Sequence, residues 1–567
     1  MVEADDIAAH ATRALVFEKD VAVPASDGLL LRANVYRPKG EGRYPVVMAM
    51  GIYGKDAHFA DAFKPQWDSL LRVYPDLCDA GSTGHFLRWE NVDPERWVPD
   101  GYVVVTVDSR GSGKSPGYLD PFSQRETADF YDAIEWAAAQ PWSNGKVGLI
   151  GISYFAIKQW QVAALQPPHL AAIVPWEGAS DFYRDWSHHG GILSHSFPTA
   201  WWPRQALVNQ HGSGDSTYRD RDTGERTTGE AISKDMLAGS RADHPRDLLA
   251  HPLADQWHKE RTPDMTRVTV PVLSAGNWGG PGVHLRGNVN GFLEAASTQK
   301  WLSMHVGTHF DSFYMPAYVT LQKRFFDRFL KGEDNGWDDT PPVRLEIRGP
   351  HGATVRHEQE WPLARTQWVP YFLDAQAGAL SSDSSADATL TFEALGAGAH
   401  FSTPPFAVET EFTGPLAAKL YVSSSTTDLD LFVTLRLLDP EGSEVRFIGA
   451  HEPVPVARGW LRASHRKTDP VRSTPARPWH THDEVQKLVP GEVVEVDVEI
   501  WPTSILVPPG YRLVLTIQGC DYQYEGLTGR ILHTHPEDRP MPEFGGTTTI
   551  HTGGDTPSHL LLPQIPN

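Results

Sequence analysis

Hydrophobic residues in the N-terminal half of the chain follow two spacings. Residues 20–23 and 29–36 have a period of two and flank Asp27-Gly28, which predicts an antiparallel hairpin. Short, almost wholly apolar runs follow, typical of strands buried on both faces of a parallel sheet. These runs are Tyr44–Met50, Tyr102–Val107, Val147–Ile150, Leu170–Val174 and Val268–Ala275. The helical stretch Glu126–Ala139 precedes the third run, so strands alternate with helices as in a doubly wound α/β sheet.

Two long segments interrupt this alternation. Residues 56–100 form an insertion, and a loop of that length inside a compact domain is usually functional. Residues 181–267 carry Trp, His and many charges without a strand pattern. We expect the second segment to form a helical cap over the carboxyl edge of the sheet.

The pattern changes after Lys331-Gly332. From Pro342 onward, short alternating strands are separated by Pro and Gly, which indicates an antiparallel sandwich or jelly roll. We therefore predict four segments: the first part of an α/β domain (1–180), a helical cap (181–267), the second part of the α/β domain (268–341), and a β-sandwich (342–567).

Composition narrows the class of protein. A chain of 567 residues is too long to fold around one hydrophobic core, so two or three domains are expected. The net charge of −21 argues against nucleic-acid or membrane partners, since both need a basic face. The two cysteines have no metal-ligand spacing, and the acidic Met1–Asp6 lacks signal-peptide features. No apolar run approaches about 18 residues. We expect a cytoplasmic protein; the sequence leaves homo-oligomerisation open.

A serine lies at the junction of a predicted strand and helix. Gly151-Ile152-Ser153 follows the third apolar run and precedes the helical Lys158–Leu165. At such a sharp turn a serine is strained, and its Oγ projects above the sheet at the positive end of the helix. Phe155 stands where the motif G-x-S-x-G has its second glycine, and a loop serine is the alternative. The surrounding strand–helix pattern favours a nucleophile.

Several motifs together resemble one family, in the same order along almost the whole chain. It is the superfamily of X-Pro dipeptidyl-peptidases, cocaine esterases and α-amino-acid ester hydrolases, the CocE/NonD-like serine hydrolases. The matching segments are Gly51–Lys55, Asp108–Ser115, Gly151–Tyr154 with Gln159-Trp160, Pro175–Glu177, Asp181–Arg184, Leu461–Arg466 and Val507–Leu513. The resemblance implies an α/β-hydrolase domain with a cap, followed by a jelly roll. It implies no cofactor and no metal.

The resemblance also implies roles for individual residues. The hydroxyl of Tyr53 and the backbone N–H of Tyr154 would form the oxyanion hole, where each donor contributes about 3–4 kcal/mol. For Tyr53, simple packing is the alternative. His309, in the turn after the strand ending near His305, would be the base. His305 itself is assigned to packing, and His188-His189 with His480 and His482 to solvated or cap positions.

The carboxylate that would orient the histidine is where this chain departs from the family pattern. Where the family has Gly-Trp-x-Asp, this chain reads Asn277-Trp278-Gly279-Gly280, and no carboxylate follows before Glu294. We predict that Glu177 replaces it, because the carboxyl ends of adjacent strands converge on one site. Asp181 is the next candidate, and Asn277 is a weaker partner for the histidine. A salt bridge from Glu177 to Arg184 or Arg110 is the structural alternative.

These features predict a serine hydrolase that cleaves a small-molecule ester, amide or lactone through an acyl-enzyme on Ser153. Four cap aromatics are expected to line an apolar acyl pocket, with core packing as the alternative: Trp186, Phe197, Trp201 and Trp202. The loop Gly279–Gly282 lacks the carboxylates that hold a substrate amine, so a carboxylesterase is favoured over an X-Pro dipeptidyl-peptidase or amino-acid ester hydrolase. A catalytically impaired scaffold with a carbohydrate-binding-like sandwich is the alternative from another class.

Overall fold

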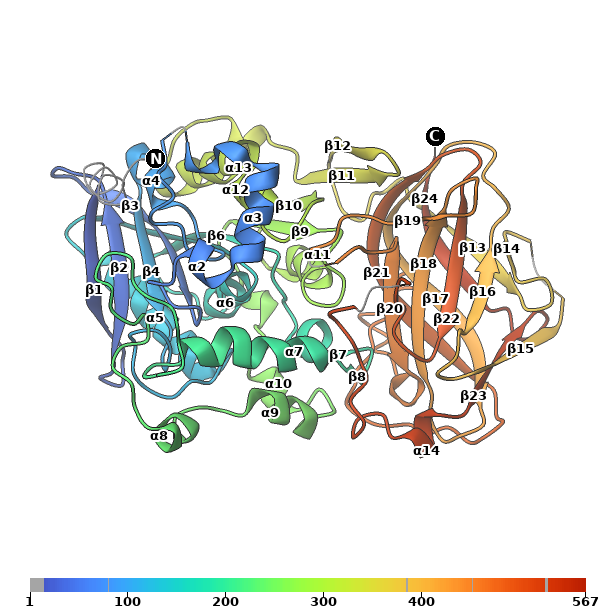
Figure 1. The fold of residues 1–567 in the computed structure, drawn as a ribbon. Helices are drawn as coiled ribbons and strands as arrows, with labels where there is room; N and C mark the ends of the chain where they lie inside the picture. Colours follow the sequence, from blue (N-terminus) through green and yellow to red (C-terminus); the bar gives the residue numbers. More distant parts are fainter. Residues whose placement is uncertain (1–14, 80, 384–385, 451, 526–528, 567) are drawn as a thin grey trace.

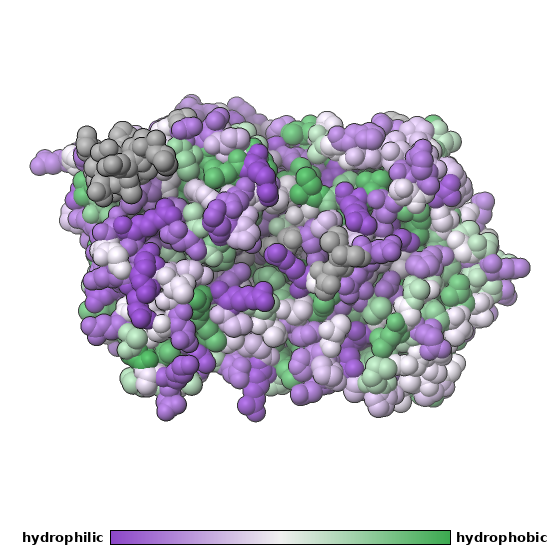
Figure 2. Space-filling view, in the orientation of Figure 1, coloured by the Kyte–Doolittle hydropathy of each residue, from purple (hydrophilic) through white to green (hydrophobic). Residues whose placement is uncertain are grey.

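The structure is a computed structural model in which two bodies lie side by side, an α/β half and a β-rich half (Figure 1). It describes residues 15–79, 81–383, 386–450, 452–525 and 529–566, so the acidic stretch Met1–Asp6 lies outside the described residues. None of the described helices is long and apolar enough to cross a membrane. On the face shown in Figure 2, polar side chains cover both halves and apolar groups are small and scattered.

The α/β half is built on a mixed sheet in the order β1-β2-β4-β3-β5-β6-β9-β10. β1 and β2 form the predicted antiparallel hairpin, β2 pairs antiparallel with β4, and the remaining strands run parallel. The strands are β1 (Val16–Pro24), β2 (Leu30–Arg37), β3 (Tyr44–Gly51), β4 (Val103–Asp108), β5 (Ser143–Ile152), β6 (Leu170–Trp176), β9 (Val272–Asn277) and β10 (Lys300–His305). All five predicted apolar runs are confirmed as strands of this sheet.

Period-two alternation in β3 supplies both faces of the sheet with core residues. Val46 and Met48 join one core with Phe130 of helix α5 (Gln124–Ala138), whereas Val47 joins another with Phe326 of α13 (Pro316–Phe326). The strand is therefore apolar at nearly every position, as strands covered on both sides must be. Helices α6 (Tyr154–Ala163) and α11 (Leu285–Glu294) also pack on the sheet.

The segment between β6 and β9 is helical only in part. Its longest helical run covers residues 196–209, where α7 (Ser196–Trp201) continues into a π-helical turn (Trp202–Ala206) and a 3₁₀ turn (Leu207–Asn209). The other elements are a π-helix (Phe182–Ser187), β7 (His188–His189), β8 (Ile192–Leu193), α8 (Lys234–Gly239), α9 (His244–Ala250), α10 (Gln256–Lys259) and a 3₁₀ turn (Met265–Arg267). The insertion between β3 and β4 contains α2 (Phe59–Ala62), α3 (Lys64–Val73) and α4 (Pro94–Trp97).

The sheet of the α/β half continues into the β-rich half through β11 (Val343–Gly349). This strand pairs parallel with β10 and antiparallel with β12 (Gly352–Glu358). Antiparallel pairs dominate beyond it, with β17 beside β21 and β24, and β18 beside β20 and β22. The main strands are β13 (Gln367–Asp374), β15 (Ala388–Glu393), β16 (Ala399–Ser402), β17 (Thr410–Ser424), β18 (Asp430–Leu438), β20 (Ala457–Arg462), β21 (Val494–Val507), β22 (Arg512–Gln518), β23 (Thr547–Thr552) and β24 (His559–Ile565). The β-rich C-terminal part predicted from the alternating pattern is confirmed.

Histidines lie buried where the cap meets the β-rich half. The imidazole of His188 stacks on Tyr183 with ring centroids 4.7 Å apart, and His482 lies 5.0 Å from the same ring. His189 and His480 are buried as well. All four are buried, so the solvated alternative is wrong for each of them. His188 and His189 lie in the cap segment, as the other alternative had it, whereas His480 and His482 belong to the β-rich half that packs against them.

One buried arginine joins three parts of the molecule. Arg286 of α11 contacts Asp185 of the cap at 2.9 Å and Glu499 of β21 at 3.0 Å. The side chain of Arg286 is 2% exposed and that of Asp185 is 0% exposed, so the Asp185 carboxylate would stay buried without its partner if the guanidinium were removed.

We predict that Arg286→Met lowers the thermal unfolding temperature by several degrees. Removing one partner of a buried ion pair costs about 3–5 kcal/mol, because a charge is left buried without compensation. Differential scanning fluorimetry measures the effect. Arg328→Met, which breaks an exposed pair with Asp338, is the matched control and should leave the midpoint unchanged. Equal midpoints for the two variants would contradict this role of Arg286.

Candidate active site

Ser153 lies at a strained turn between β5 and α6. Its backbone has φ 57° and ψ −112°, a conformation that a non-glycine residue rarely adopts. The backbone N–H of Ser153 donates to the carbonyl of Trp176 at 3.0 Å, which anchors the turn to the end of β6. The side chain is buried and lines a cavity.

Two glycines explain why this turn tolerates Phe155. Gly151 has φ 156°, and a Cβ there would lie 2.6 Å from Cβ of Phe155. A Cβ at Gly51 would lie 2.6 Å from the ring of Phe155. The phenylalanine that replaces the second glycine of the motif therefore occupies space left by a glycine on the neighbouring strand β3.

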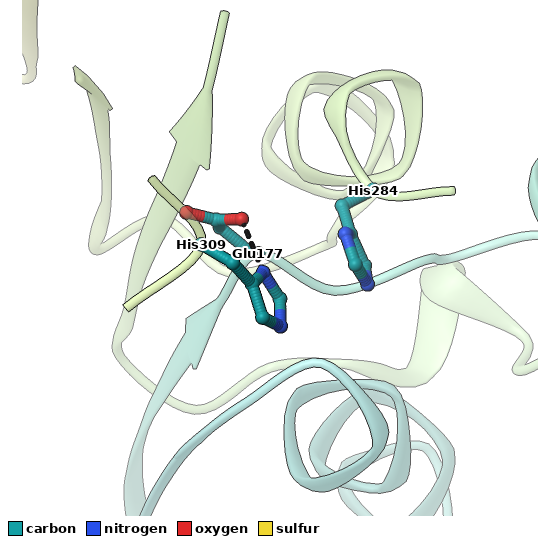
Figure 3. Close-up of side chains that lie close together, drawn as sticks. All are labelled: Glu177, His284 and His309. Atoms are coloured by element: carbon teal, nitrogen blue, oxygen red, sulfur yellow. Dashed lines mark hydrogen bonds and ion pairs between the residues drawn. The ribbon is translucent and has the colours of Figure 1, made fainter. Parts of the chain in front are cut away.

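Glu177 and His309 are in direct contact, although they follow strands that are not neighbours. An oxygen of Glu177, after β6, lies 2.7 Å from Nδ1 of His309, after β10 (Figure 3). β9 lies between these two strands. Glu177 has φ 48°, and its N–H donates to Ala275 of β9 at 2.7 Å, which directs the carboxylate across that strand.

Two further side chains hold the carboxylate of Glu177. His305 Nε2 lies 3.0 Å from Oε1, and the amide of Asn277 donates to the same oxygen at 3.2 Å. The Asn277 amide also donates to the carbonyl of Gly307 at 3.0 Å. His305 packs against Trp176, as expected, but it also fixes Glu177, which the sequence did not indicate.

The second candidate for the acid, Asp181, and the two arginines proposed as partners of Glu177 have other partners. Asp181 pairs with Arg184 at 2.7 Å and accepts backbone N–H groups at the start of the π-helix. Arg110 pairs with Asp129 at 2.7 Å. The alternative in which Glu177 forms a salt bridge with one of these arginines is therefore not seen among the described residues.

A second carboxylate reaches the same histidine from the other side. Oε1 of Glu90 lies 3.0 Å from Nε2 of His309. Glu90 belongs to the insertion at 56–100, has φ 60°, and its carbonyl accepts the N–H of Ile152 beside the nucleophile turn. No motif marks Glu90; only the unusual length of the insertion pointed to this segment.

The two carboxylates determine the proton affinity of His309. Burial lowers the pKa of His309, but Glu177 and Glu90 outweigh this effect and raise the pKa to about 10. Burial raises the pKa of Glu90 to about 7, and its bond to His309 offsets this only in part. For Glu177, His309 and His305 outweigh the opposing effect of burial and lower the pKa.

The nucleophile has a second histidine beside it. Oγ of Ser153 lies 3.0 Å from Nε2 of His284, which directly precedes α11. The rings of His284 and His309 are nearly parallel, with centroids 5.0 Å apart (Figure 3). The sequence analysis missed His284, although it lies four residues after Gly280, in the loop where the family places its acid.

Close packing explains why this loop is rich in glycine. A Cβ at Gly279 would lie 2.5 Å from the carbonyl oxygen of Ile448, in a loop of the β-rich half. The N–H of Ala450 donates to Gly279, and the N–H of His309 donates to Ala450. The loop of the β-rich half therefore occupies the space beside the expected acid position and also fixes the backbone of His309.

Tyr53 lines the same cavity as Ser153, and Tyr154 directly follows Ser153 in the chain. The indole N–H of Trp201 donates to the hydroxyl oxygen of Tyr53 at 2.9 Å, which leaves the hydroxyl hydrogen to be donated elsewhere. Burial raises the pKa of Tyr53 well above its ordinary value, so the hydroxyl stays protonated. Tyr154 is the first residue of α6, where backbone N–H groups have no partner within the helix. Its side chain donates to Glu126 at 2.6 Å.

A cavity of about 520 Å³ opens over these groups. It is lined by Ser153, His309, Glu90 and Tyr53, by Phe197 of the cap, and by residues 446–450 of the β-rich half. Trp186, Trp201 and Trp202 are not among the described lining residues. They are buried and pack in the aromatic core behind the wall, where Trp186 and Trp201 have ring centroids 5.2 Å apart.

Glu177, His284 and His309 form a set of groups that a transition metal prefers. Each offers one ligand atom, and these atoms lie within 4.8 Å of one another. Nδ1 of His309 and Nε2 of His284 already contact Glu177 and Ser153, respectively. These two nitrogens therefore already have hydrogen-bond partners within the protein.

We predict that Glu90→Gln lowers the pKa of His309 by about 1–3 pH units, because it removes a negative charge in contact with the imidazolium. NMR titration of protein labelled with ¹⁵N-histidine measures this value. Asp181→Asn, which removes a carboxylate paired with Arg184, is the control and should leave the titration in place. An unchanged His309 titration in Glu90→Gln would contradict the geometry.

Comparisons with known proteins identify the family of the chain. Residues 27–311 match the X-Pro dipeptidyl-peptidase (S15) family, and residues 335–561 match the X-Pro dipeptidyl-peptidase C-terminal non-catalytic domain. Cocaine esterase from Rhodococcus sp. (strain MB1 Bresler) is 26% identical over 96% of this chain and 98% of its own length.

Two solved structures extend the comparison. A CocE/NonD family hydrolase from Staphylococcus aureus superposes with a TM-score of 0.84 and 34% identity, covering 97% of this chain and 94% of its own. An α-amino acid ester hydrolase, with a TM-score of 0.68, 17% identity and 97% of both chains covered, shares the fold. The chain therefore belongs to the X-Pro dipeptidyl-peptidase (S15) family and is a serine hydrolase.

Proposed function

We propose that this serine hydrolase cleaves carboxylic esters through an acyl-enzyme on Ser153. His309 acts as the base in its neutral form, and Glu177 holds it in the required tautomer. To take the serine proton, Nε2 of His309 must exchange its contact with Glu90 for one with Ser153. The hydroxyl of Tyr53 and the backbone N–H of Tyr154 stabilise the oxyanion. The observation that carries the proposal is the 2.7 Å contact between Glu177 and Nδ1 of His309, beside a strained serine in the same cavity.

The reaction proceeds in two half-reactions on one carbonyl carbon. Oγ of Ser153 attacks the carbonyl and its proton passes to His309, while the carbonyl oxygen becomes an oxyanion facing Tyr53. His309 gives this proton to the leaving alcohol, which departs and leaves an ester on Ser153. Water then attacks the acyl carbon and gives a proton to His309, the C–Oγ bond breaks, and His309 returns the proton to Oγ.

The position of Glu177 weighs against an impaired scaffold. That alternative rested on the missing Asp at Gly280. A carboxylate on the neighbouring strand end can do the same work, because only its contact with Nδ1 of the histidine matters. The positive φ of Glu177 supports this role, since strained residues concentrate where function requires them.

Ester cleavage is favoured over peptide cleavage by the carboxylates near the cavity. An enzyme that grips a substrate amine needs a carboxylate able to accept it, and the loop Gly279–Gly282 has none. Glu90 lines the cavity but is bonded to His309. Glu452 also lines it, but pairs with Arg458 and accepts the backbone N–H of Arg530. Among the relatives, cocaine esterase is named for an ester, whereas a protein of Streptomyces avermitilis, 24% identical over 75% of this chain and 68% of its own length, is named as a putative Xaa-Pro dipeptidyl-peptidase.

For the β-rich half, we propose a jelly-roll sandwich spanning residues 342–567. Support comes from its antiparallel pairing and from an apolar core shared by β17, β18, β21 and β22. Its part in the reaction is structural: residues 446–450 close one side of the cavity over Ser153.

The preference for esters can be tested with two classes of substrate. The protein should hydrolyse aryl esters and should not turn over Xaa-Pro-anilides, and Ser153→Ala should lower kcat by at least about 10⁴-fold. A fluorophosphonate probe should label the native protein at Ser153 and leave the variant unlabelled. Faster turnover of the anilides than of the esters would establish the peptidase instead, and undiminished turnover by Ser153→Ala would exclude the acyl-enzyme.

The role of Glu177 as the orienting acid can be tested by substitution. Glu177→Gln should lower kcat by about 10⁴-fold, since a histidine in the wrong tautomer cannot accept the serine proton. Asp181→Asn is the matched control, because Asp181 is buried nearby but bonded to Arg184; its kcat should stay within about tenfold of the native value. If the two variants lost activity equally, Glu177 would not be the orienting acid.

A further inference from the structure

Three arginines line the cavity over Ser153. Arg72 belongs to α3 of the insertion, and Arg446 and Arg530 belong to loops of the β-rich half. All three arginines are exposed, whereas Ser153 is buried. The arginines therefore lie at the mouth of the cavity, and the reacting hydroxyl lies at its bottom.

The guanidinium groups of these arginines have no carboxylate partner among the described residues. Cζ of Arg446 lies 4.3 Å from the ring centroid of Tyr524, a contact that holds the side chain without neutralising its charge. An arginine without such a partner can bind an anion through two parallel N–H donors. The mouth of the cavity therefore offers three positive charges to a ligand.

The carboxylates in the cavity wall do not cancel these charges. Glu90 is bonded to Nε2 of His309 at 3.0 Å. Glu452 pairs with Arg458 at 3.4 Å and accepts the backbone N–H of Arg530 at 2.6 Å. Three arginines thus face two glutamates, one of which already has an arginine partner outside this set. The described cavity wall is therefore positively charged, although the chain as a whole has a net charge of −21.

Hydrogen bonds fix the two arginine loops of the β-rich half beside the catalytic residues. The loop that begins at Arg446 reaches Ala450, whose carbonyl accepts the N–H of His309 at 3.2 Å. The carbonyl of Arg530 accepts the hydroxyl of Ser196, in α7 of the cap, at 2.6 Å. The backbones that carry these two arginines are therefore held in place, as a preorganised binding site requires.

Resting on the proposed function, we infer that the enzyme prefers esters that carry a second, anionic group. Arg72, Arg446 and Arg530 bind this group at the mouth while the ester carbonyl reaches Ser153. A cavity of about 520 Å³ accommodates a small molecule that spans both places. The local positive charge concentrates such substrates at a protein that otherwise repels anions. Half-esters of dicarboxylic acids and esters of hydroxy acids belong to this class.

Two pairs of esters test the preference, and the members of each pair differ in one carboxylate. In the first pair the charge is on the acid: the mono-4-nitrophenyl ester of adipic acid is compared with 4-nitrophenyl hexanoate. In the second pair it is on the leaving group: 3-carboxyphenyl butyrate is compared with phenyl butyrate. The charged member of at least one pair should have a kcat/KM about tenfold higher or more, and about 0.5 M NaCl should lower this ratio by screening.

Substitution of the arginines tests which residues cause the preference. The triple variant Arg72→Gln, Arg446→Gln, Arg530→Gln should lower the charged-to-neutral ratio of kcat/KM by about tenfold, mainly through KM, because the anionic group lies away from the reacting carbonyl. These side chains are exposed, so the thermal midpoint should not change. Arg43→Gln, at an exposed arginine in the loop before β3, is the matched control and should keep the native ratio.

A native protein that hydrolyses the neutral member of both pairs at least as efficiently as the charged one would overturn the inference. A triple variant that keeps the native ratio would overturn it as well. Failure of the proposed function itself has a different signature: none of the four esters would be hydrolysed, or Ser153→Ala would retain activity and the fluorophosphonate probe would not label Ser153.

Discussion

The bond between Glu177 and His309 bridges strand ends that are not adjacent. Glu177 follows β6, His309 follows β10, and β9 lies between them. The bond forms because Glu177 adopts a positive φ and is tied through its N–H to β9, while Asn277 and His305 fix the carboxylate. A glutamate, with one more methylene than aspartate, has the reach for this distance. In the proposed mechanism the orienting acid therefore follows β6 instead of β9, without a change of fold.

The packing of one loop accounts for the glycine at position 279 and for the role of the β-rich half. The backbone of Ile448 comes so close to Gly279 that a side chain there would collide with it. The neighbouring Ala450 holds both Gly279 and His309 by backbone hydrogen bonds. The β-rich half is thus part of the active-site wall. The buried Arg286 joins the β-rich half to α11 and to the cap. The stability of this interface therefore affects the geometry of the active site.

The sequence predicted those features that depend on the order of residues along a short stretch of chain. The parallel strands follow from valine-rich runs, the serine turn from a strand–helix junction, and Glu177 from the convergence of strand ends. Glu90 and His284 were missed because their roles depend on where a long insertion and a glycine-rich loop fold back, which no spacing encodes. The cap tryptophans were expected in the pocket, but aromatic composition does not distinguish a lining residue from one packed behind it.

The most direct test of this account is a crystal structure of the protein inactivated by a fluorophosphonate. The account predicts a phosphonyl group on Oγ of Ser153, with one oxygen accepting bonds from the Tyr53 hydroxyl and the Tyr154 N–H, and Glu177 still in contact with Nδ1 of His309. A phosphonyl oxygen turned away from Tyr53, or a His309 without a carboxylate on Nδ1, would contradict it.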